Sequence, residues 1–242
     1  MQDVSWLALE TSTDVVSLAL SRGTQVWSHT LEGGAKSSAH TLPEVRRMMR
    51  EAELSFSQLQ AVVFGRGPGA FTGLRTACSV AQGLAFAASL KVLPIDTLLA
   101  VAEVARTQLQ TQADTSVLRI LSVLDARMDQ VYAAAYEHTD TGWQCVQAAE
   151  VLAPEEVHWP THWADNAFVC AGNAHALLAA RAPAPVQAQL VSAWPSATAL
   201  LRLAPQAWRD GLAVAPEAAL PLYIRDKVAQ TTAERTQATI QP

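Results

Sequence analysis

Cysteine is scarce in this sequence of 242 residues, which contains only three. Cys78, Cys145 and Cys170 are far apart, odd in number and without the Cys-x-x-Cys spacing of a zinc ribbon, so they predict neither a disulfide framework nor a structural zinc site. The sequence also lacks a basic and apolar leader at its start, and its longest uncharged stretch, residues 76–90, is interrupted by polar residues and glycine. We therefore expect a cytoplasmic chain without a membrane segment.

Positive charge is in short supply as well. The 17 Lys and Arg residues are outnumbered by 22 Asp and Glu, which gives a net charge of −5 and excludes a wholly basic nucleic-acid clamp. A local basic patch is still compatible, and Arg46, Arg47 and Arg50 form a cluster that tRNA or an acidic partner could use. With 50% apolar residues the chain is not disordered, and its length suits one large domain or two small ones.

Apolar periodicity predicts an order of strands and helices that favours an α/β fold. The first thirty residues predict an antiparallel meander, and an amphipathic helix follows behind a Thr41–Glu44 capping box. A strand, a largely buried helix, a second strand and a second helix come next, which implies a parallel extension of the sheet. The expected elements cover residues 6–9, 15–20, 25–31, 41–53, 61–64, 74–90, 92–95 and 97–110.

The polar residues 110–116 lack periodicity and are the expected boundary, after which the pattern starts again. Strands are expected at 117–124, 131–136, 143–151 and 169–171, with helices near 154–159, 174–181 and 196–210. In each half an acid ends the first strand and a second acid follows four residues later, which indicates duplication. We expect an N-terminal lobe over 1–110, a C-terminal lobe over 117–226 and a polar tail over 227–242, part of which could pack on the first lobe.

Glycine is densest over residues 65–73, between a strand and a buried helix. A Walker phosphate loop is excluded because Gly-Lys-Ser/Thr is absent, and a dinucleotide fingerprint matches only in part, without the acid expected about 20 residues later. Two interpretations stay open. The helix N-terminus could bind an anion, or Gly67, Gly69 and Gly73 form a tight structural turn that lets the helix approach the sheet.

Four segments, in order between residue 4 and about residue 229, carry a family resemblance. They are Leu7–Ser12, the nonapeptide Gly67–Arg75, Leu124–Arg127 with Val131–Ala134, and Pro221–Ala229 with its Pro-x-Tyr-x-Arg start. Together they resemble the bacterial TsaB family, and the nonapeptide and the Pro-x-Tyr-x-Arg segment are the most specific of them.

The resemblance implies an actin/Hsp70/sugar-kinase-like (ribonuclease H-like) α/β fold, in which two related lobes each contain a mixed β-sheet flanked by helices. It also implies a non-catalytic subunit that binds the catalytic subunit TsaD, of which the family is a paralogue, and with it the ATPase TsaE. This complex transfers a threonylcarbamoyl group to the adenosine beside the anticodon of tRNAs that read codons starting with A. The chain would contact tRNA through the complex and would form a homodimer when alone.

Nucleotide-binding enzymes of this fold carry an Asp-x-Gly loop after the first strand of each lobe. The corresponding positions here run from Glu10 to Ser12 and from Asp125 to Arg127, so both glycines are missing. The Gly-Gly pair that usually faces adenosine is reduced to Gly172. We therefore expect Glu10, Ser12, Asp125 and Gly172 to be degenerate positions that bind nucleotide weakly or not at all, and we expect no cofactor.

Metal and nucleophilic chemistry are also poorly supported by the sequence. The catalytic paralogue carries His-x-x-x-His on its first long helix, whereas here His40 is followed by Glu44 in the second position. A site would need a third and a fourth ligand, and none is recognisable. There is no Gly-x-Ser-x-Gly elbow and no cysteine in an electropositive motif. We expect no metal site and no catalytic residue.

Function is then expected to reside in surfaces. Small residues permit close helix approach and methionine tolerates varied partners, and two predicted helices carry such stripes. The candidate partner-contacting residues are Leu42, Val45, Met48, Met49, Leu74, Ala77, Val80, Ala81 and Leu84. By the resemblance, these helices form a four-helix bundle with those of TsaD or of a second copy; alternatively, both stripes cover their own sheet. The rival functions are an ATP-using or metal-dependent enzyme of the same fold, and a free-standing homodimeric binding protein.

Overall fold

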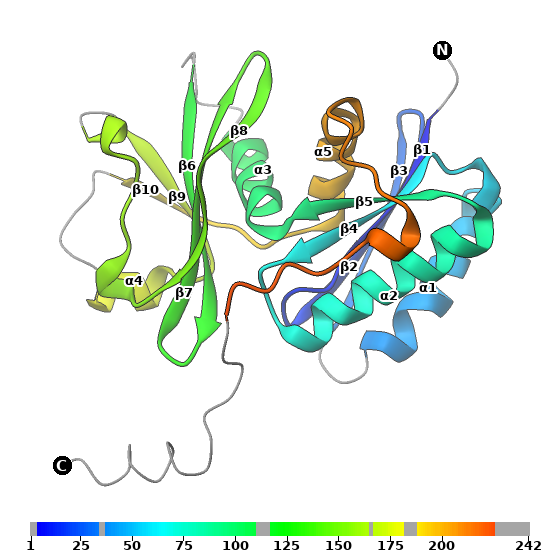
Figure 1. Ribbon diagram of the computed structural model, residues 1–242, viewed down its shortest axis with the longest axis horizontal. Coiled ribbons are helices and arrows are strands. Elements are labelled where there is room, and N and C mark those ends of the chain that lie inside the picture. Colours follow the sequence, from blue (N-terminus) through cyan, green and yellow to red (C-terminus); the bar gives the residue numbers. More distant parts are fainter. Residues whose placement is uncertain (1–3, 34–36, 110–116, 165–166, 182–187, 226–242) are drawn as a thin grey trace, which may run out of the picture.

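The computed structural model describes residues 4–33, 37–109, 117–164, 167–181 and 188–225 (Figure 1). Within them the chain forms two five-stranded mixed sheets, of order β3-β2-β1-β4-β5 and β10-β9-β6-β7-β8. The first contains β1 (Ser5–Glu10), β2 (Val15–Arg22), β3 (Gln25–Glu32), β4 (Ala61–Gly67) and β5 (Lys91–Asp96). The second contains β6 (Leu118–Arg127), β7 (Gln130–Thr139), β8 (Gly142–Leu152), β9 (Phe168–Gly172) and β10 (Ala188–Ser192).

The two sheets repeat one topology. The central strand of each, β1 or β6, pairs antiparallel with the next strand and parallel with a later one, β4 or β9. The helices that cover the sheets are α1 (Ser37–Glu51), α2 (Phe71–Ala88), α3 (Thr97–Leu109), α4 (His175–Arg181) and α5 (Ala197–Arg209). The predicted α/β class and its two related lobes are therefore confirmed.

Two details of the sequence-based prediction are wrong. Helix α1 begins at Ser37, so Thr41 and Glu44 lie inside it and do not form a capping box at its start, and Pro43 is likewise internal. The helix expected over 154–159 is only a short 3₁₀ turn, η3 (Pro154–Glu156). In both places a proline followed by acidic residues is typical of a helix start, and this local signal did not fix where the helix begins or how long it runs.

Every residue of β1, the central strand of the first sheet, is buried, which shows that both faces of this sheet are covered. Alternate side chains of a strand point to opposite faces. Leu7 and Leu9 pack with Met48 of α1 and other residues of α1 and α2, whereas Trp6 and Ala8 pack with residues of α5. Helices α1 and α2 therefore lie on one face of this sheet and α5 on the other (Figure 1).

One helix of each half of the chain packs on the sheet of the other half. Leu98 and Val101 of α3, which belongs by sequence to the first half, are in the apolar cluster of the second sheet. Leu200 and Leu203 of α5, from the second half, are in the cluster under the first sheet. Helix α5 thus packs on the first lobe, although it lies within the range 117–226 that was expected for the C-terminal lobe. Burial pattern alone does not tell which of two apolar sheets a helix covers.

A buried carboxylate joins the elements that cross between the lobes. Glu103 of α3 is 2% exposed and accepts hydrogen bonds from Arg106, from Arg202 of α5 and from the indole of Trp143 on β8. Although burial alone would raise the pKa of Glu103, the hydrogen bonds from Arg106, Trp143 and Arg202 hold it below its usual value. The three elements are thus fixed to one another by a charged group without access to water.

After α5 the chain returns across the first lobe as a strap, which we define as residues 213–225. Val214 bridges to Val92, and the Ala219 carbonyl accepts hydrogen bonds from Gln82 (2.9 Å) and Cys78 (3.4 Å) of α2. The strap then runs from the side of α2 toward the second lobe (Figure 1). The tail expected over 227–242 lies outside the described residues. In the part of the chain that is described, no helix is both long and apolar enough to cross a lipid bilayer.

Candidate functional site

The first turn of α2 packs directly on the turn between β1 and β2. The Ala70 amide donates to the Ser12 carbonyl (2.7 Å), and the Thr11 hydroxyl donates to the Gly73 carbonyl (2.6 Å). A Cβ atom at Gly73 would lie 1.8 Å from the Thr11 carbonyl oxygen, and one at Gly69 would lie 2.6 Å from the Ser12 Cβ. Glycine is needed here so that two backbone segments can touch.

Two other glycines that the sequence singled out lie at strand ends and have positive φ, namely Gly67 (+117°) at the end of β4 and Gly172 (+147°) at the end of β9. A Cβ at Gly172 would be 1.7 Å from the Val123 carbonyl oxygen of β6. Gly172 thus permits the close pairing of β9 with β6, where the strand leaves the sheet.

Glu10 is buried inside the first lobe, with 1% of its surface exposed. Its Oε1 accepts the Ser12 amide (2.7 Å) and its Oε2 accepts the Thr97 hydroxyl (3.3 Å). The carboxyl group lies against Gly65, where a Cβ would be 1.8 Å from Oε2. Burial raises the pKa of Glu10, and its hydrogen bonds oppose this shift. Glu10 joins β1 to β4 and to the start of α3, and it is not among the described residues that line the cleft between the lobes.

This cleft consists of two adjoining cavities of about 260 Å³ and about 210 Å³. They share five lining residues, Gly69, Ala70, Ala126, Arg127 and Tyr132. The larger cavity also has Phe71, Met128, Tyr223 and Arg225 in its wall, and the smaller one has Ser12, Asp14, Asp125, Asn173 and Trp194. All four segments that carry the family resemblance thus contribute residues to one cleft.

The mouth of the cleft is bridged by Arg127. Its Nη2 lies 2.7 Å from Oδ2 of Asp14 in the first lobe, and its Nη1 lies 3.5 Å from Oδ2 of Asp125. The Arg127 amide also donates to Asp125 Oδ1 (2.7 Å). Ser12 on the opposite wall is buried.

The residues present do not fit the magnesium–nucleotide group that enzymes of this fold bind. The first acid, Glu10, is buried away from the cleft, and the second, Asp125, is already hydrogen-bonded and ion-paired with Arg127. The loop that would approach phosphate is in backbone contact with the first turn of α2. Two of the predicted degenerate positions, Ser12 and Asp125, therefore line the cleft. The other two, Glu10 and Gly172, lie inside the lobes.

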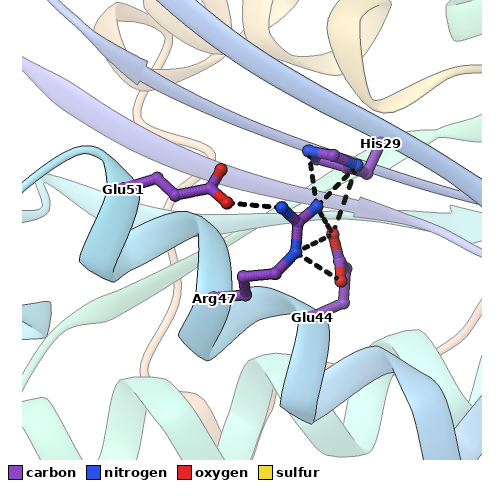
Figure 2. Close-up of polar contacts among 4 residues, drawn as sticks. All are labelled: His29, Glu44, Arg47 and Glu51. Carbon is purple, nitrogen blue, oxygen red and sulfur yellow. Dashed lines mark hydrogen bonds and ion pairs between the residues drawn. The ribbon is translucent and has the colours of Figure 1, made fainter.

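The predicted His40 and Glu44 pair on α1 is not arranged as a metal site. His40 is exposed, and Glu44 accepts two hydrogen bonds from Arg47 Nε (3.0 and 3.1 Å) and lies 3.3 Å from His29 Nδ1 on β3. Figure 2 shows these contacts together with the Arg47–Glu51 ion pair. The hydrogen bond from Arg47 holds the pKa of Glu44 below its usual value. Within the described ranges, no group of three His, Cys, Asp or Glu residues could hold a metal ion.

Most of the predicted partner-contacting residues are not exposed on the surface of the chain. Six of the nine are buried in the core of the chain itself, which favours the alternative in which both stripes cover their own sheet: Val45, Met48, Met49, Leu74, Ala77 and Ala81. The other three are half-buried at the edges of the helices: Leu42, Val80 and Leu84. The outer face of α2 is instead formed by exposed residues that include Ser79, Gly83 and Phe86, of which Phe86 is 78% exposed.

A cluster at the cleft was not predicted as a site. Arg75 of α2 lies over the Phe71 ring at 3.7 Å and donates to the Tyr223 hydroxyl (3.2 Å), and the Phe71 and Tyr223 ring centroids are 5.3 Å apart. Arg225 donates to the Arg127 carbonyl (3.3 Å). The sequence did carry a signal, because Tyr223 and Arg225 are the fixed residues of its Pro-x-Tyr-x-Arg segment. It did not indicate that this segment reaches the nonapeptide.

Comparison with known proteins agrees with this architecture. The family model for TsaD, "tRNA N6-adenosine threonylcarbamoyltransferase", matches residues 25–241. The chain is 31% identical over 226 residues to the tRNA threonylcarbamoyladenosine biosynthesis protein TsaB of Escherichia coli, covering 92% of this chain and 95% of that protein. The TsaB protein of Haemophilus influenzae is 32% identical over 164 residues, which are 64% of this chain and 67% of that protein.

The solved structure of YeaZ from Pseudomonas aeruginosa superposes on this chain with a TM-score of 0.81 and 36% identity, covering 91% of this chain and 99% of that one. The likeness therefore extends over both lobes and the cleft between them, and is not confined to the glycine-rich segment. On this evidence the chain belongs to the TsaB (YeaZ) proteins, within the wider family that the TsaD model describes.

Proposed function

We propose that this chain is a non-catalytic scaffold and activator subunit in the biosynthesis of tRNA threonylcarbamoyladenosine. The names of its relatives support the pathway, and the match to the TsaD family model supports descent from the same ancestor as the transferase. In this proposal the chain binds the catalytic subunit TsaD and, with it, the ATPase TsaE in the cytoplasm. It meets tRNA through the complex and forms a homodimer when alone.

The single observation that carries the non-catalytic assignment is the position of Glu10. An acid that holds magnesium has to reach the cleft, but Glu10 is enclosed by Gly65, Thr97 and the Ser12 amide. Moving it outward would break two hydrogen bonds and leave a buried hydroxyl and amide unpaired, which costs about 1–3 kcal/mol for each group.

The outer face of α2, which we define by the exposed Ser79, Gly83 and Phe86, is the docking surface that we propose for TsaD or for a second copy. It is separate from the buried stripe of the same helix, which covers the sheet. The space around a Cβ at Gly83 is open, and Ser79 is small and exposed, so a partner helix can approach α2 closely. Phe86, at 78% exposure, supplies the large apolar side chain that such an interface needs at its centre.

Co-expression of the full chain with TsaD from the same organism tests the docking surface. We expect Phe86→Glu and Ser79→Glu to abolish co-purification, since each places a charge in the contact. Val26→Glu is the control, because Val26, like Phe86, is an exposed apolar residue (55%) but lies on the edge strand β3. If only Val26→Glu loses binding, or if all three variants still bind, the interface does not lie on this face. Val45→Glu and Met48→Glu are unsuitable, since both residues are buried and a charge there would unfold the chain.

The rival enzyme function has a separate test. Isothermal titration of the purified chain with ATP and magnesium, and assays of ATP hydrolysis, are expected to give no saturable signal for the natural sequence. Tight binding or turnover that disappears in Glu10→Ala would overturn the non-catalytic assignment. A free-standing homodimer with another task would instead leave the tRNA modification intact when the gene is deleted.

A further inference from the structure

The cleft region that the sequence did not predict forms a surface at the seam of the two lobes. We call it the seam surface and define it as Phe71, Arg75, Met128, Tyr223 and Arg225. Phe71 and Arg75 come from α2, Met128 from the tip of the β6–β7 hairpin, and Tyr223 and Arg225 from the strap. All but Arg75 line the cavity of about 260 Å³, and Arg75 stacks on Phe71 at its rim.

Large apolar side chains at this surface are open to solvent. Met128 is 51% exposed and Tyr223 is 47% exposed, and Leu220 on the same strap is 68% exposed. None of the three belongs to the apolar clusters that form the core within the described residues. Met128 and Tyr223 line the same cavity, and exposed apolar side chains gathered around a cavity are typical of a binding surface.

The charge of the seam surface is positive and is not neutralised. Arg75 and Arg225 have no carboxylate partner in the described part of the chain, whereas Arg66, Arg127 and Arg181 each form ion pairs. Arg75 uses its Nε to bond Tyr223 and the plane of its guanidinium to cover Phe71, which fixes the side chain. Its two terminal nitrogens have no hydrogen-bond partner among the described residues, so they are free to bind a ligand. Such a pre-positioned guanidinium binds a carboxylate or a phosphate with two parallel hydrogen bonds.

The rest of the surface decides between these two anions. Arginine, tyrosine and methionine around an apolar cavity are the composition of a protein interface. A nucleic acid requires a longer series of cations than Arg75 and Arg225 provide, whereas a single carboxylate needs only one guanidinium. The nearby Asp14 and Asp125 are already paired with Arg127. The observations therefore favour a protein segment over an RNA.

We propose that the seam surface binds an acidic protein segment, with one apolar or aromatic side chain in the cavity and a carboxylate on Arg75. This surface is additional to the outer face of α2 and does not depend on the function proposed for that face. Arg225 is a positioning residue, because its hydrogen bonds to the Arg127 carbonyl and to Gln130 (2.5 Å) hold the strap against the second lobe.

The test uses the purified full chain and a fluorescein-labelled peptide of sequence Glu-Glu-Leu-Trp-Glu-Glu as the probe. Fluorescence anisotropy is expected to give saturable binding that weakens at least tenfold in Arg75→Gln and in Tyr223→Ala. The control Arg209→Gln, which changes an exposed arginine at the end of α5 without a carboxylate partner among the described residues, is expected to bind as the natural chain does. Circular dichroism melts confirm that each variant is folded.

Four results would overturn the proposal. The first is the absence of saturable binding by the natural chain. The second is an equal loss of affinity in Arg209→Gln, which would indicate general attraction between charges. The third is tighter, Arg75-dependent binding of a ten-nucleotide oligouridine, which would assign the surface to RNA. The fourth concerns a peptide with Gln in place of every Glu. It is expected to bind at least tenfold more weakly, and equal binding would exclude the carboxylate contact.

Discussion

Arg127 joins the two lobes across the cleft through Asp14, with 2.7 Å between Nη2 and Oδ2, from a backbone in the left-handed region (φ +62°). The next two residues, Met128 and Asp129, also have positive φ (+53° and +55°). A two-residue hairpin turn that follows the twist of its strands requires this conformation, and Gly or Asn usually adopts it. The tip that faces the first lobe thus consists of three consecutive residues whose side chains disfavour this conformation.

Two substitutions of Arg127 distinguish the contribution of its ion pair to stability from the contribution of its left-handed backbone conformation. Arg127→Gln and Arg127→Gly both remove the contact with Asp14, which is worth at most about 1 kcal/mol because both side chains are mostly exposed. Glycine alone also relieves the left-handed backbone, a gain of about 1 kcal/mol. Urea unfolding at pH 7 is therefore expected to find Arg127→Gly more stable than Arg127→Gln by about 1 kcal/mol. Equal stabilities would mean that the turn is not strained.

Loss of the Glu103 charge is expected to be costly. Glu103→Gln leaves the guanidinium groups of Arg106 and Arg202 without their buried counter-ion, which should lower the free energy of unfolding at pH 7 by about 3 kcal/mol. Because the folded pKa of Glu103 is depressed, its contribution is present above the unfolded pKa of about 4.3 and is lost as the pH falls through the lower folded value.

The difference between Glu103→Gln and the natural chain should therefore shrink in urea titrations taken from pH 7 toward pH 3. Glu155→Gln is the control, since Glu155 pairs with Arg181 on the surface and its loss should change stability little. A gap between Glu103→Gln and the natural chain that stays constant with pH would show that the variant fails for steric reasons.

Glu10 has the opposite pH dependence. Its folded pKa is raised by burial, so the stabilising contribution of its neutral form is complete below the unfolded pKa and is lost as the pH rises through the folded pKa. Glu10→Gln stays neutral and keeps an oxygen for the Ser12 amide. We expect the stability of this variant relative to the natural chain to increase, by up to about 1.4 kcal/mol per pH unit, as the pH rises from the unfolded pKa of about 4.3 to the folded pKa. If the curves of Glu10→Gln and of the natural chain are parallel over this range, Glu10 ionises in the folded chain as it does in water.

The sequence predicted the sheets better than the surfaces. The apolar runs of β1 and β4 indicated an α/β fold, because strands are marked by short runs of consecutive apolar residues. The repeated acid spacing indicated duplication, and the family resemblance implied the two related lobes. The stripe that contains Val45 and Met48 predicted an amphipathic helix correctly, but a stripe gives the period of a helix and not the identity of what covers it. In the fold both residues contact the sheet of their own lobe, and the exposed face has less apolar character.

The degenerate site was only partly predictable for a related reason. Glu10 and Asp125 occupy equivalent places in the two halves of the sequence, yet Glu10 is buried and Asp125 lines the cleft. The difference arises from Gly65 and Thr97, which are distant in sequence and enclose Glu10 only after the chain has folded. No local pattern around either acid carries that information.

Two glycines of α2 allow the packing role of the nonapeptide to be measured against helix propensity. Gly73→Ala is expected to lower the free energy of unfolding by about 3 kcal/mol, because the added Cβ would meet the Thr11 carbonyl oxygen at 1.8 Å and would push α2 away from the β1–β2 turn. Gly83→Ala, in the same helix, has open space around the added methyl group and should raise it by about 0.5–1 kcal/mol. Urea unfolding of both variants at one pH measures the contrast. A stabilised Gly73→Ala would mean that α2 can shift freely on the turn, and the close backbone contact would then have no structural role.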